Sequence, residues 1–457
     1  MIVLEPQFIH KLIDILLSKG GNFSDIYIEE DEMFSFVLEN NVIKTIKTGN
    51  EGGVHLRVIS DDKSYCAYAN EIIPDKLEIL AGNIADSLSA GRTNQAKNID
   101  SNLNFITTSK LHLGMYESCI RDFLDTSKKI YVASPKICQA TLSFSQSFKR
   151  IWIANSDGLV SSDERQYSRY MINVVAKDGS ITETAYEGPG ITGDQNIFDL
   201  YPLETTSEKV VKRVLASLNA TQAPLGKMPV VLMGEAGGTM IHEACGHAFE
   251  ADFIYKDTSI FGNKMGQKIA SDNVTVIDDG SIPGLYGSFS IDDEGVEAKK
   301  TVLIENGVLK GYMTDRLSAG LLNIPLTGNG RRESFRSKPI PRMSNTFIEN
   351  QNMIPEEILS TVSNGILVKR MGGGQVNITN GEFIFEISEG YEIKNGKVTN
   401  QIRGASMIGN GPDVLNDIES VGNDKCFLPG VCGKFDHVPV SDAQPTIKIK
   451  QMTIGGK

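Results

Sequence analysis

The chain has 457 residues, and its 45 basic and 57 acidic side chains give a formal net charge of −12. This acidic balance argues against a nucleic-acid-binding surface. The composition, 40% hydrophobic and 22% charged, is ordinary for a soluble globular protein, and the length allows two or three domains. No apolar run approaches the roughly 18 residues needed to span a membrane.

The first residues, Met1 to Gln7, include Glu5 and no basic cluster, so we expect no secretory signal peptide. The cysteines are scattered without the spacing of a disulfide framework: Cys66, Cys119, Cys138, Cys245, Cys426 and Cys432. We therefore expect a reducing environment and a cytoplasmic protein.

Residues 1–90 read as a small N-terminal α+β unit. Apolar residues recur at helical spacing over 6–19, and a glycine pair then ends the helix. Period-two alternation over 24–68, interrupted by turn sequences, predicts hairpins of an antiparallel sheet. A second helical pattern over 75–90 completes the unit.

Residues 91–108, rich in Asn, Ser and Thr, are typical of a linker. Residues 109–223 then form a predicted middle α+β unit. It begins with a helix near 109–127, continues with long alternating segments that predict another antiparallel sheet, and ends with a helix over 205–219.

Residues 224–457 form the predicted C-terminal domain. A buried strand over 228–233 leads into a glycine turn and the stretch 234–250, after which the sequence is glycine-rich and β-like. The fold class is thus α+β: N-terminal antiparallel-sheet units with flanking helices, followed by a mainly β domain that carries a metal-binding helix.

The stretch 234–250 contains His242, Glu243 and His247, a metal-site pattern in which the histidines are five rather than four residues apart. In a regular helix a spacing of five turns the second imidazole roughly 140° from the first, against about 40° for a spacing of four. A π-bulge or a break at Cys245-Gly246 would bring the rings together.

The alternative is a pair of histidines packed in a core. We favour the metal site because the pair follows a strand and a glycine turn, where the start of a helix would open to a cleft. Glu243, next to the first histidine, would then have a function as the base that takes a proton from water activated by the metal.

A catalytic zinc takes three protein ligands and keeps a fourth position open. The candidates for the third ligand are Cys245, Cys426, Cys432, His437, Asp252 and Glu250. Cys245 fits a core residue better. Cys432 is better placed, in a glycine-flanked loop where Lys434 would favour the thiolate. A thiolate ligand favours Zn2+ over magnesium or manganese.

Three further motifs carry weaker predictions. Arg331 and Arg332 would stabilise an oxyanion or hold a substrate carboxylate, with an internal salt bridge as an equal alternative. Gly373, within three consecutive glycines, would let a substrate backbone approach closely, although a tight turn explains it as well. The acidic run 292–294 is typical of a solvated hairpin or a weak cation site.

Four segments together carry a resemblance to a known family: His-Glu-Ala-Cys-Gly-His-Ala-Phe-Glu-Ala-Asp-Phe from 242, Thr-Gly-Asn-Gly-Arg-Arg-Glu-Ser from 327, Gly-Gly-Gly-Gln-Val from 372, and Cys-Gly-Lys from 432. The chain resembles the TldD branch of the TldD/PmbA metalloproteases over nearly its whole length, most strongly from residue 228. The PmbA (TldE) paralogues lack the metal motif, so its presence here indicates the catalytic branch.

The resemblance implies that His242, His247 and Cys432 bind zinc and that Glu243 is the base. It also implies a cytoplasmic peptidase that cuts short or unfolded polypeptides, bound in extended form in a dimer cleft. The expected partner is a TldE/PmbA-like paralogue or a second copy of the chain, with no membrane or nucleic acid involved. The alternative is a non-catalytic polypeptide-binding or scaffold protein whose zinc is structural, closed by a fourth ligand.

One departure from the family pattern follows the last motif. The family commonly continues with x-Gly-Gln, whereas this chain has Phe435-Asp436-His437. His437 is therefore open to three interpretations: a group that supports a metal ligand, an alternative ligand, or an exposed loop histidine.

Overall fold

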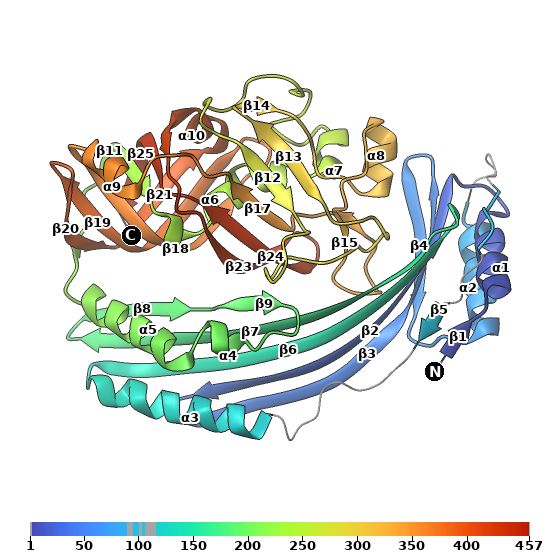
Figure 1. Cartoon of the computed structure of the whole chain (residues 1–457), viewed down its shortest axis with the longest axis horizontal. Coiled ribbons are helices and arrows are strands. Elements are labelled where there is room, and N and C mark those ends of the chain that lie inside the picture. Colours follow the sequence, from blue (N-terminus) through green and yellow to red (C-terminus); the bar gives the residue numbers. More distant parts are fainter. Residues whose placement is uncertain (1, 89–94, 100–102, 106–115, 457) are drawn as a thin grey trace.

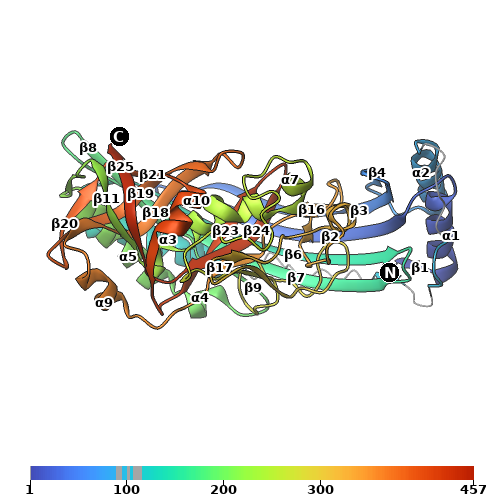
Figure 2. The ribbon, with the colours of Figure 1, turned by 90° about the horizontal axis from the view of Figure 1, so that it is seen from above.

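The computed structural model describes residues 2–88, 95–99, 103–105 and 116–456. The molecule is elongated, with a C-terminal domain above a set of long, curved strands and two N-terminal helices at one end (Figures 1 and 2). Among the described residues, no helix is both long and apolar enough to cross a membrane.

A seven-stranded sheet forms the base of the molecule, in the order β4-β3-β2-β6-β7-β8, with β9 also paired to β7. Its strands are β2 (Phe23–Glu39), β3 (Val42–Ser60), β4 (Lys63–Ala69), β6 (Ile137–Asn155), β7 (Val160–Asp178), β8 (Ile181–Glu187) and β9 (Gly190–Thr192).

The prediction of a second, separate sheet in the middle unit is wrong, because β2 pairs with β6 over 15 residues and joins both units in one sheet. A period of two identifies a strand and its faces but not its pairing partner. Just over half of the predicted linker 91–108 lies outside the described residues, and the division into domains stays a prediction.

The two faces of the sheet differ in character. One face is covered by helices that bury apolar side chains such as Ile26 and Phe34. These helices are α1 (Pro6–Leu17), α2 (Pro74–Asp86), α3 (Tyr116–Ala133) and α5 (Leu203–Ser217). Three lie close to the predicted positions, whereas α3 continues six residues beyond the end predicted at 127. On the opposite face, Tyr27 and Ile153 pack against Phe335 of the C-terminal domain.

The C-terminal domain contains two larger sheets and a common core. The six-stranded sheet has the order β14-β13-β12-β17-β24-β23, with β14 (Val308–Leu309), β13 (Lys300–Glu305), β12 (Val276–Asp279), β17 (Asn345–Ile348), β24 (His437–Gln444) and β23 (Cys426–Gly433). The eight-stranded sheet contains β10 (Thr221–Gln222), β20 (Lys397–Arg403), β19 (Glu382–Lys394), β18 (Asn364–Val376), β11 (Gly226–Leu232), β25 (Ile447–Gly456), β21 (Ala405–Asn410) and β22 (Ile418–Val421).

Strand β19 also pairs with β21, so the pairings of β18, β11, β25, β21 and β19 close on themselves. A single buried cluster joins both sheets to the segment 240–254. The predicted fold class, antiparallel-sheet units with flanking helices followed by a mainly β C-terminal domain, is confirmed.

Charged side chains join the long sheet to the C-terminal domain. Arg57 of β3 pairs with Asp25 of β2 and lies 2.8 Å from Glu294 of the C-terminal domain. Arg165 of β7 pairs with Asp293 at 2.8 Å. The acidic run 292–294 is therefore buried, and the prediction of a solvated hairpin is wrong, since these carboxylates accept bonds from arginines and backbone amides.

Candidate metal centre

The metal motif begins after β11, and its helical backbone changes form within it. Short turns η2 (Gly234–Ala236) and α6 (Thr239–Ile241) lead into a π-helical turn, η3 (His242–Gly246), followed by η4 (His247–Phe249) and α7 (Ala251–Tyr255). The His247 amide donates to the His242 carbonyl, five residues back. The predicted π-bulge is confirmed, and it makes the five-residue spacing compatible with two converging imidazoles.

Gly246, the last residue of the π-turn, packs against the segment that precedes β17. A Cβ atom at this position would overlap the sulfur of Met343. A larger residue would therefore push the turn away from its neighbour, and with it the backbone that carries both histidines.

The structure brings the two histidines and Cys432 together. The Cys432 Sγ atom lies 3.2 Å from His242 Nε2 and 3.3 Å from His247 Nε2, and all three atoms lie within 4.8 Å of one another. All three residues are buried. Two imidazole nitrogens and a thiolate fit zinc, which is bound by this donor set in proteins.

Each histidine is oriented by a carboxylate on its other ring nitrogen. His242 Nδ1–H donates to Asp442 Oδ1 at 2.7 Å, and His247 Nδ1–H donates to Glu250 Oε2 at 3.0 Å. A carboxylate at Nδ1 fixes the tautomer that leaves Nε2 free as a metal ligand. Both rings thus present the same atom to Cys432.

The three ligands also shift one another's pKa values. Burial alone would raise the pKa of Cys432, but the charge of His242 and the hydrogen bonds from both histidines lower it well below its ordinary value. Burial lowers the pKa of His247, while Glu250 and Cys432 more than reverse this and raise it to about 10. Without a metal the site therefore favours a thiolate that accepts from protonated imidazoles, and the binding of a metal would release the Nε2 protons.

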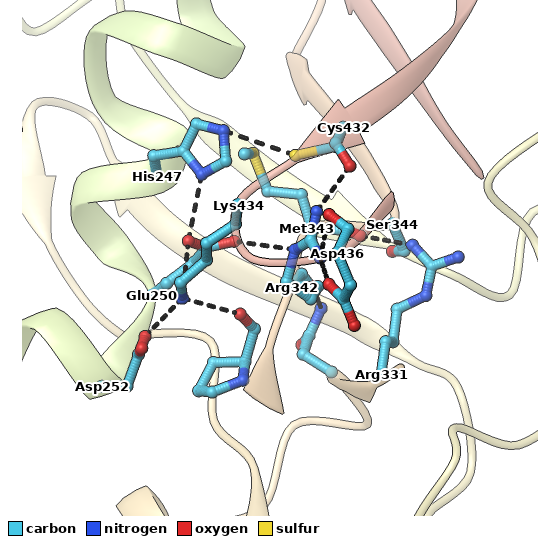
Figure 3. A network of polar contacts seen from close by, with 12 residues as sticks. His247, Glu250, Asp252, Arg331, Arg342, Met343, Ser344, Cys432, Lys434 and Asp436 are labelled. Atoms are coloured by element: carbon cyan, nitrogen blue, oxygen red, sulfur yellow. Dashed lines mark hydrogen bonds and ion pairs between the residues drawn. The ribbon is translucent and has the colours of Figure 1, made fainter. Parts of the chain in front are cut away.

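A second layer of ion pairs surrounds the ligands (Figure 3). Lys434 Nζ lies 3.0 Å from Glu250 Oε2 and donates to Asp252 Oδ1 at 2.6 Å. Arg342 donates to the Cys432 carbonyl at 2.6 Å. Burial raises the pKa of Glu250, but Lys434 and His247 outweigh it and lower the pKa to about 2.

This layer corrects two predictions about Cys432. The residue lies in strand β23 rather than in a flexible loop, because β23 pairs with β24 as far as Gly433. Lys434 contacts the carboxylates of Glu250 and Asp252, whereas the charges that favour the Cys432 thiolate come mainly from the histidines.

Glu243 occupies the π-turn between the two histidines and is half-buried. Burial raises the pKa of its carboxyl, while the charges of His242 and His247 lower it by smaller amounts. A carboxylate with a raised pKa next to a metal centre suits the transfer of a proton.

The remaining ligand candidates lie elsewhere. The Cys245 thiol is buried and donates to the Ile241 carbonyl, as expected for a core residue. Cys426 is at the far end of β23 from Cys432. His437 is 69% exposed in its side chain, and its Nδ1 lies 3.9 Å from Glu333. Of its three interpretations, this position matches the exposed histidine.

The predicted substrate-binding arginines make internal contacts. Arg331 is buried and donates to the carbonyls of Met343 and Pro439. Arg332 is buried as well, and its guanidinium donates to the carbonyls of Ser337 and Asp293. A role for either arginine in substrate binding stays a prediction, and these internal contacts are hydrogen bonds to backbone carbonyls rather than the alternative salt bridge.

Gly373 lies at an irregularity of the β18–β19 pairing and is exposed, with open space where a side chain would project. Its proposed close approach to a substrate backbone also stays a prediction.

We did not predict Asp442 from the sequence, although its position in the pattern of a buried strand indicates a special role. Strand β24 places Val438, Val440 and Asp442 on one face. Val438 is the residue of β24 that pairs with Cys432. An acidic residue in the apolar register of a buried strand indicates a charged or metal-bound partner.

Three family models cover most of the chain. Residues 24–86 match PmbA/TldA metallopeptidase domain 1, residues 116–218 the central domain, and residues 225–456 the C-terminal domain. The chain belongs to the TldD/PmbA family. It is 34% identical to a metalloprotease TldD homolog of Buchnera aphidicola subsp. Acyrthosiphon pisum, over 99% of this chain and 96% of that protein.

Two other family members extend the comparison. A metalloprotease TldD homolog of Haemophilus influenzae is 33% identical over 99% of this chain and 97% of its own length. A zinc metalloprotease TldD homolog of Saccharolobus solfataricus is 31% identical over 74% of this chain and 76% of its own. These names indicate a metalloprotease, and the last one names the metal.

The fold is also shared with solved structures. TldE from Thermococcus kodakarensis superposes with a TM-score of 0.75 at 22% identity, covering 98% of this chain and all of that one. A putative modulator of a DNA gyrase from Thermotoga maritima gives a TM-score of 0.75 at 20% identity, covering 98% and 99% of the two chains.

Proposed function

We propose that this protein is a zinc-dependent peptidase that hydrolyses short or unfolded polypeptides, with Glu243 as the general base. The proposal rests on the group of donor atoms from His242, His247 and Cys432. Among the described residues, this group has three members. Three protein ligands and an open position are typical of a catalytic zinc, whereas structural sites have four.

His242, His247 and Cys432 would hold the zinc, which would supply Lewis-acid chemistry for the activation of water. The residues of the chain then have distinct functions. Glu243 accepts the proton of the attacking water and returns it to the leaving amine, which its raised pKa supports. Asp442 and Glu250 hold the two imidazoles in place through their Nδ1–H groups.

The partner is part of the same proposal. We infer that the chain works in a dimer, either with a TldE/PmbA-like paralogue or with a second copy of itself. The similarity in fold to TldE over the whole chain supports this pairing. A cytoplasmic location is proposed from the scattered cysteines, all of which are free.

The test is chelator-sensitive cleavage of a reduced, alkylated and therefore unfolded polypeptide, measured with the zinc-loaded protein alone and with a co-expressed paralogue. Glu243→Gln should retain zinc and lower the cleavage rate by roughly 10²- to 10⁴-fold, the usual contribution of a general base. Cleavage near the wild-type rate in this variant would contradict the role of Glu243.

A matched control is available in the preceding turn. Glu235 is half-exposed and pairs with Lys369 at 3.2 Å. Glu235→Gln makes the same chemical change and should leave both zinc content and cleavage unaltered. Cysteine loss provides the second check, because Cys432→Ala should weaken zinc binding and lower the zinc content, and unchanged zinc content would refute the third ligand.

A further inference from the structure

One large aromatic side chain stands exposed beside the metal centre. Phe435 is 84% exposed, the highest value among the large hydrophobic residues of the described C-terminal domain. It is the middle residue of the three-residue loop between β23 and β24, in which the Lys434 amide donates to the Asp436 carbonyl at 3.0 Å. Exposing a phenylalanine ring to water is unfavourable unless something covers it.

Both neighbours of Phe435 are fixed by buried ion pairs. Lys434 is bound to Glu250 and Asp252, and Asp436 pairs with Arg342 and accepts from the Glu333 amide at 3.0 Å. Figure 3 shows both residues in the network that surrounds the metal ligands. The ring of Phe435 is thus carried on a loop whose backbone position is set by the same contacts as the ligands.

The distance from the metal centre is limited by chain length. Phe435 follows the ligand Cys432 by three positions, so their Cα atoms are separated by no more than about 11 Å. An extended polypeptide advances about 3.3 Å per residue. The Cα atom of Phe435 therefore lies within a distance that about three residues of an extended polypeptide span from the Cα atom of Cys432.

We propose that Phe435 is a specificity-determining residue that contacts an apolar side chain of the polypeptide substrate close to the cleaved bond. This proposal rests on the proposed peptidase function. An exposed aromatic ring gains most from covering an aliphatic or aromatic group, since both surfaces then leave water. The chain should accordingly prefer substrates with an apolar residue at one position near the bond.

The test uses the zinc-loaded protein and a mixture of synthetic peptides of varied sequence, with cleavage sites mapped by mass spectrometry. Wild-type protein should enrich apolar residues at one position within three residues of the cut. Phe435→Ser should lower the kcat/KM of a peptide with phenylalanine there by on the order of tenfold, and leave its serine counterpart unchanged. Phe435→Tyr, which keeps the ring, should retain the preference.

Val132 provides the control, because it is 86% exposed on the outer helix α3, away from the metal centre. Val132→Ala should not alter the preference, and zinc content should be equal in all variants. An unchanged preference in Phe435→Ser overturns the assignment of Phe435 alone. If Phe435→Ser changes the number of subunits and leaves the cleavage preference unchanged, the ring contacts a partner chain instead of the substrate. That result also overturns the assignment of Phe435. Absence of any cleavage by the wild-type protein, both alone and with the co-expressed paralogue, overturns the peptidase function itself, and this proposal with it.

Discussion

One buried group of charged side chains joins the long sheet to the C-terminal domain and another lies within that domain, and the two groups differ in what their atoms contact. At the junction with the long sheet, Arg57 and Arg165 are paired with carboxylates that face them directly. At the metal centre, the carboxylates of Asp442 and Glu250 bind the outer nitrogen of each histidine. The inner nitrogens are left facing a thiol.

The comparison shows that buried charge alone does not identify a functional site. The junction neutralises its charges internally, as a buried ion-pair network must to avoid a large desolvation cost. The metal centre instead directs three donor atoms to one point, and its carboxylates are needed to hold them there. The junction is therefore expected to govern stability, and the centre to govern metal binding.

The largest effect separating the two groups is expected from Arg57→Met. The change leaves Asp25 and Glu294 buried without their cation, which costs about 3–5 kcal/mol of unfolding free energy. Urea unfolding of the zinc-loaded protein measures it. The control is Lys76→Met, which removes an exposed pair with Glu71 and should cost less than about 1 kcal/mol. Equal losses in the two variants would contradict the buried network.

The opposite outcome, a loss of zinc affinity without a loss of stability, is expected from Asp442→Asn. Loss of the carboxylate that orients His242 should weaken zinc binding by roughly 10- to 100-fold, while the fold is retained. Competition with a fluorescent zinc chelator measures the affinity. If zinc affinity fell equally in Arg57→Met and Asp442→Asn, the distinction between the two groups would be lost.

A smaller, pH-dependent effect is expected at the junction from His55, whose Nδ1–H donates to the Phe335 carbonyl at 2.9 Å. Burial, reinforced by the charge of Arg332, lowers the pKa of His55 from 6.5 to about 3. The unfolded chain therefore binds a proton below pH 6.5 that the folded protein excludes until about pH 3. Stability from this residue is lost as the pH falls through that window.

His55→Gln removes the titrating group. The unfolding free energy of the wild type minus that of the variant should fall by about 2 kcal/mol between pH 7 and pH 5. Metal affinity should be the same in both proteins at pH 7. A difference that is independent of pH would show that His55 is not held neutral by its burial.

The sequence predicted the backbone of the candidate metal centre better than the burial of the junction, for physical reasons. The five-residue spacing of His242 and His247 is a local constraint, so helical geometry alone predicts the π-turn now seen at residues 242–246. Burial of the acidic run 292–294 depends on arginines more than a hundred residues away in the chain. Its composition is equally typical of an exposed turn, which is why the prediction was wrong.

The same limit applies to the strands. Their alternation correctly placed the long segments in antiparallel sheets, but the pairing of β2 with β6 bridges more than one hundred residues and leaves no local pattern. Asp442 is an intermediate case: it lies 200 residues from His242, yet its position in the apolar register of β24 was visible in the sequence.

The most direct measurement of the central claim is X-ray absorption at the zinc edge of the wild-type protein and of Cys432→Ala. The account predicts one zinc per chain with one sulfur ligand at about 2.3 Å and two imidazole nitrogens at about 2.0–2.1 Å, leaving a position for water. The sulfur contribution should be absent from the variant. Two sulfur ligands, four protein ligands, or a sulfur signal that persists in Cys432→Ala would contradict it.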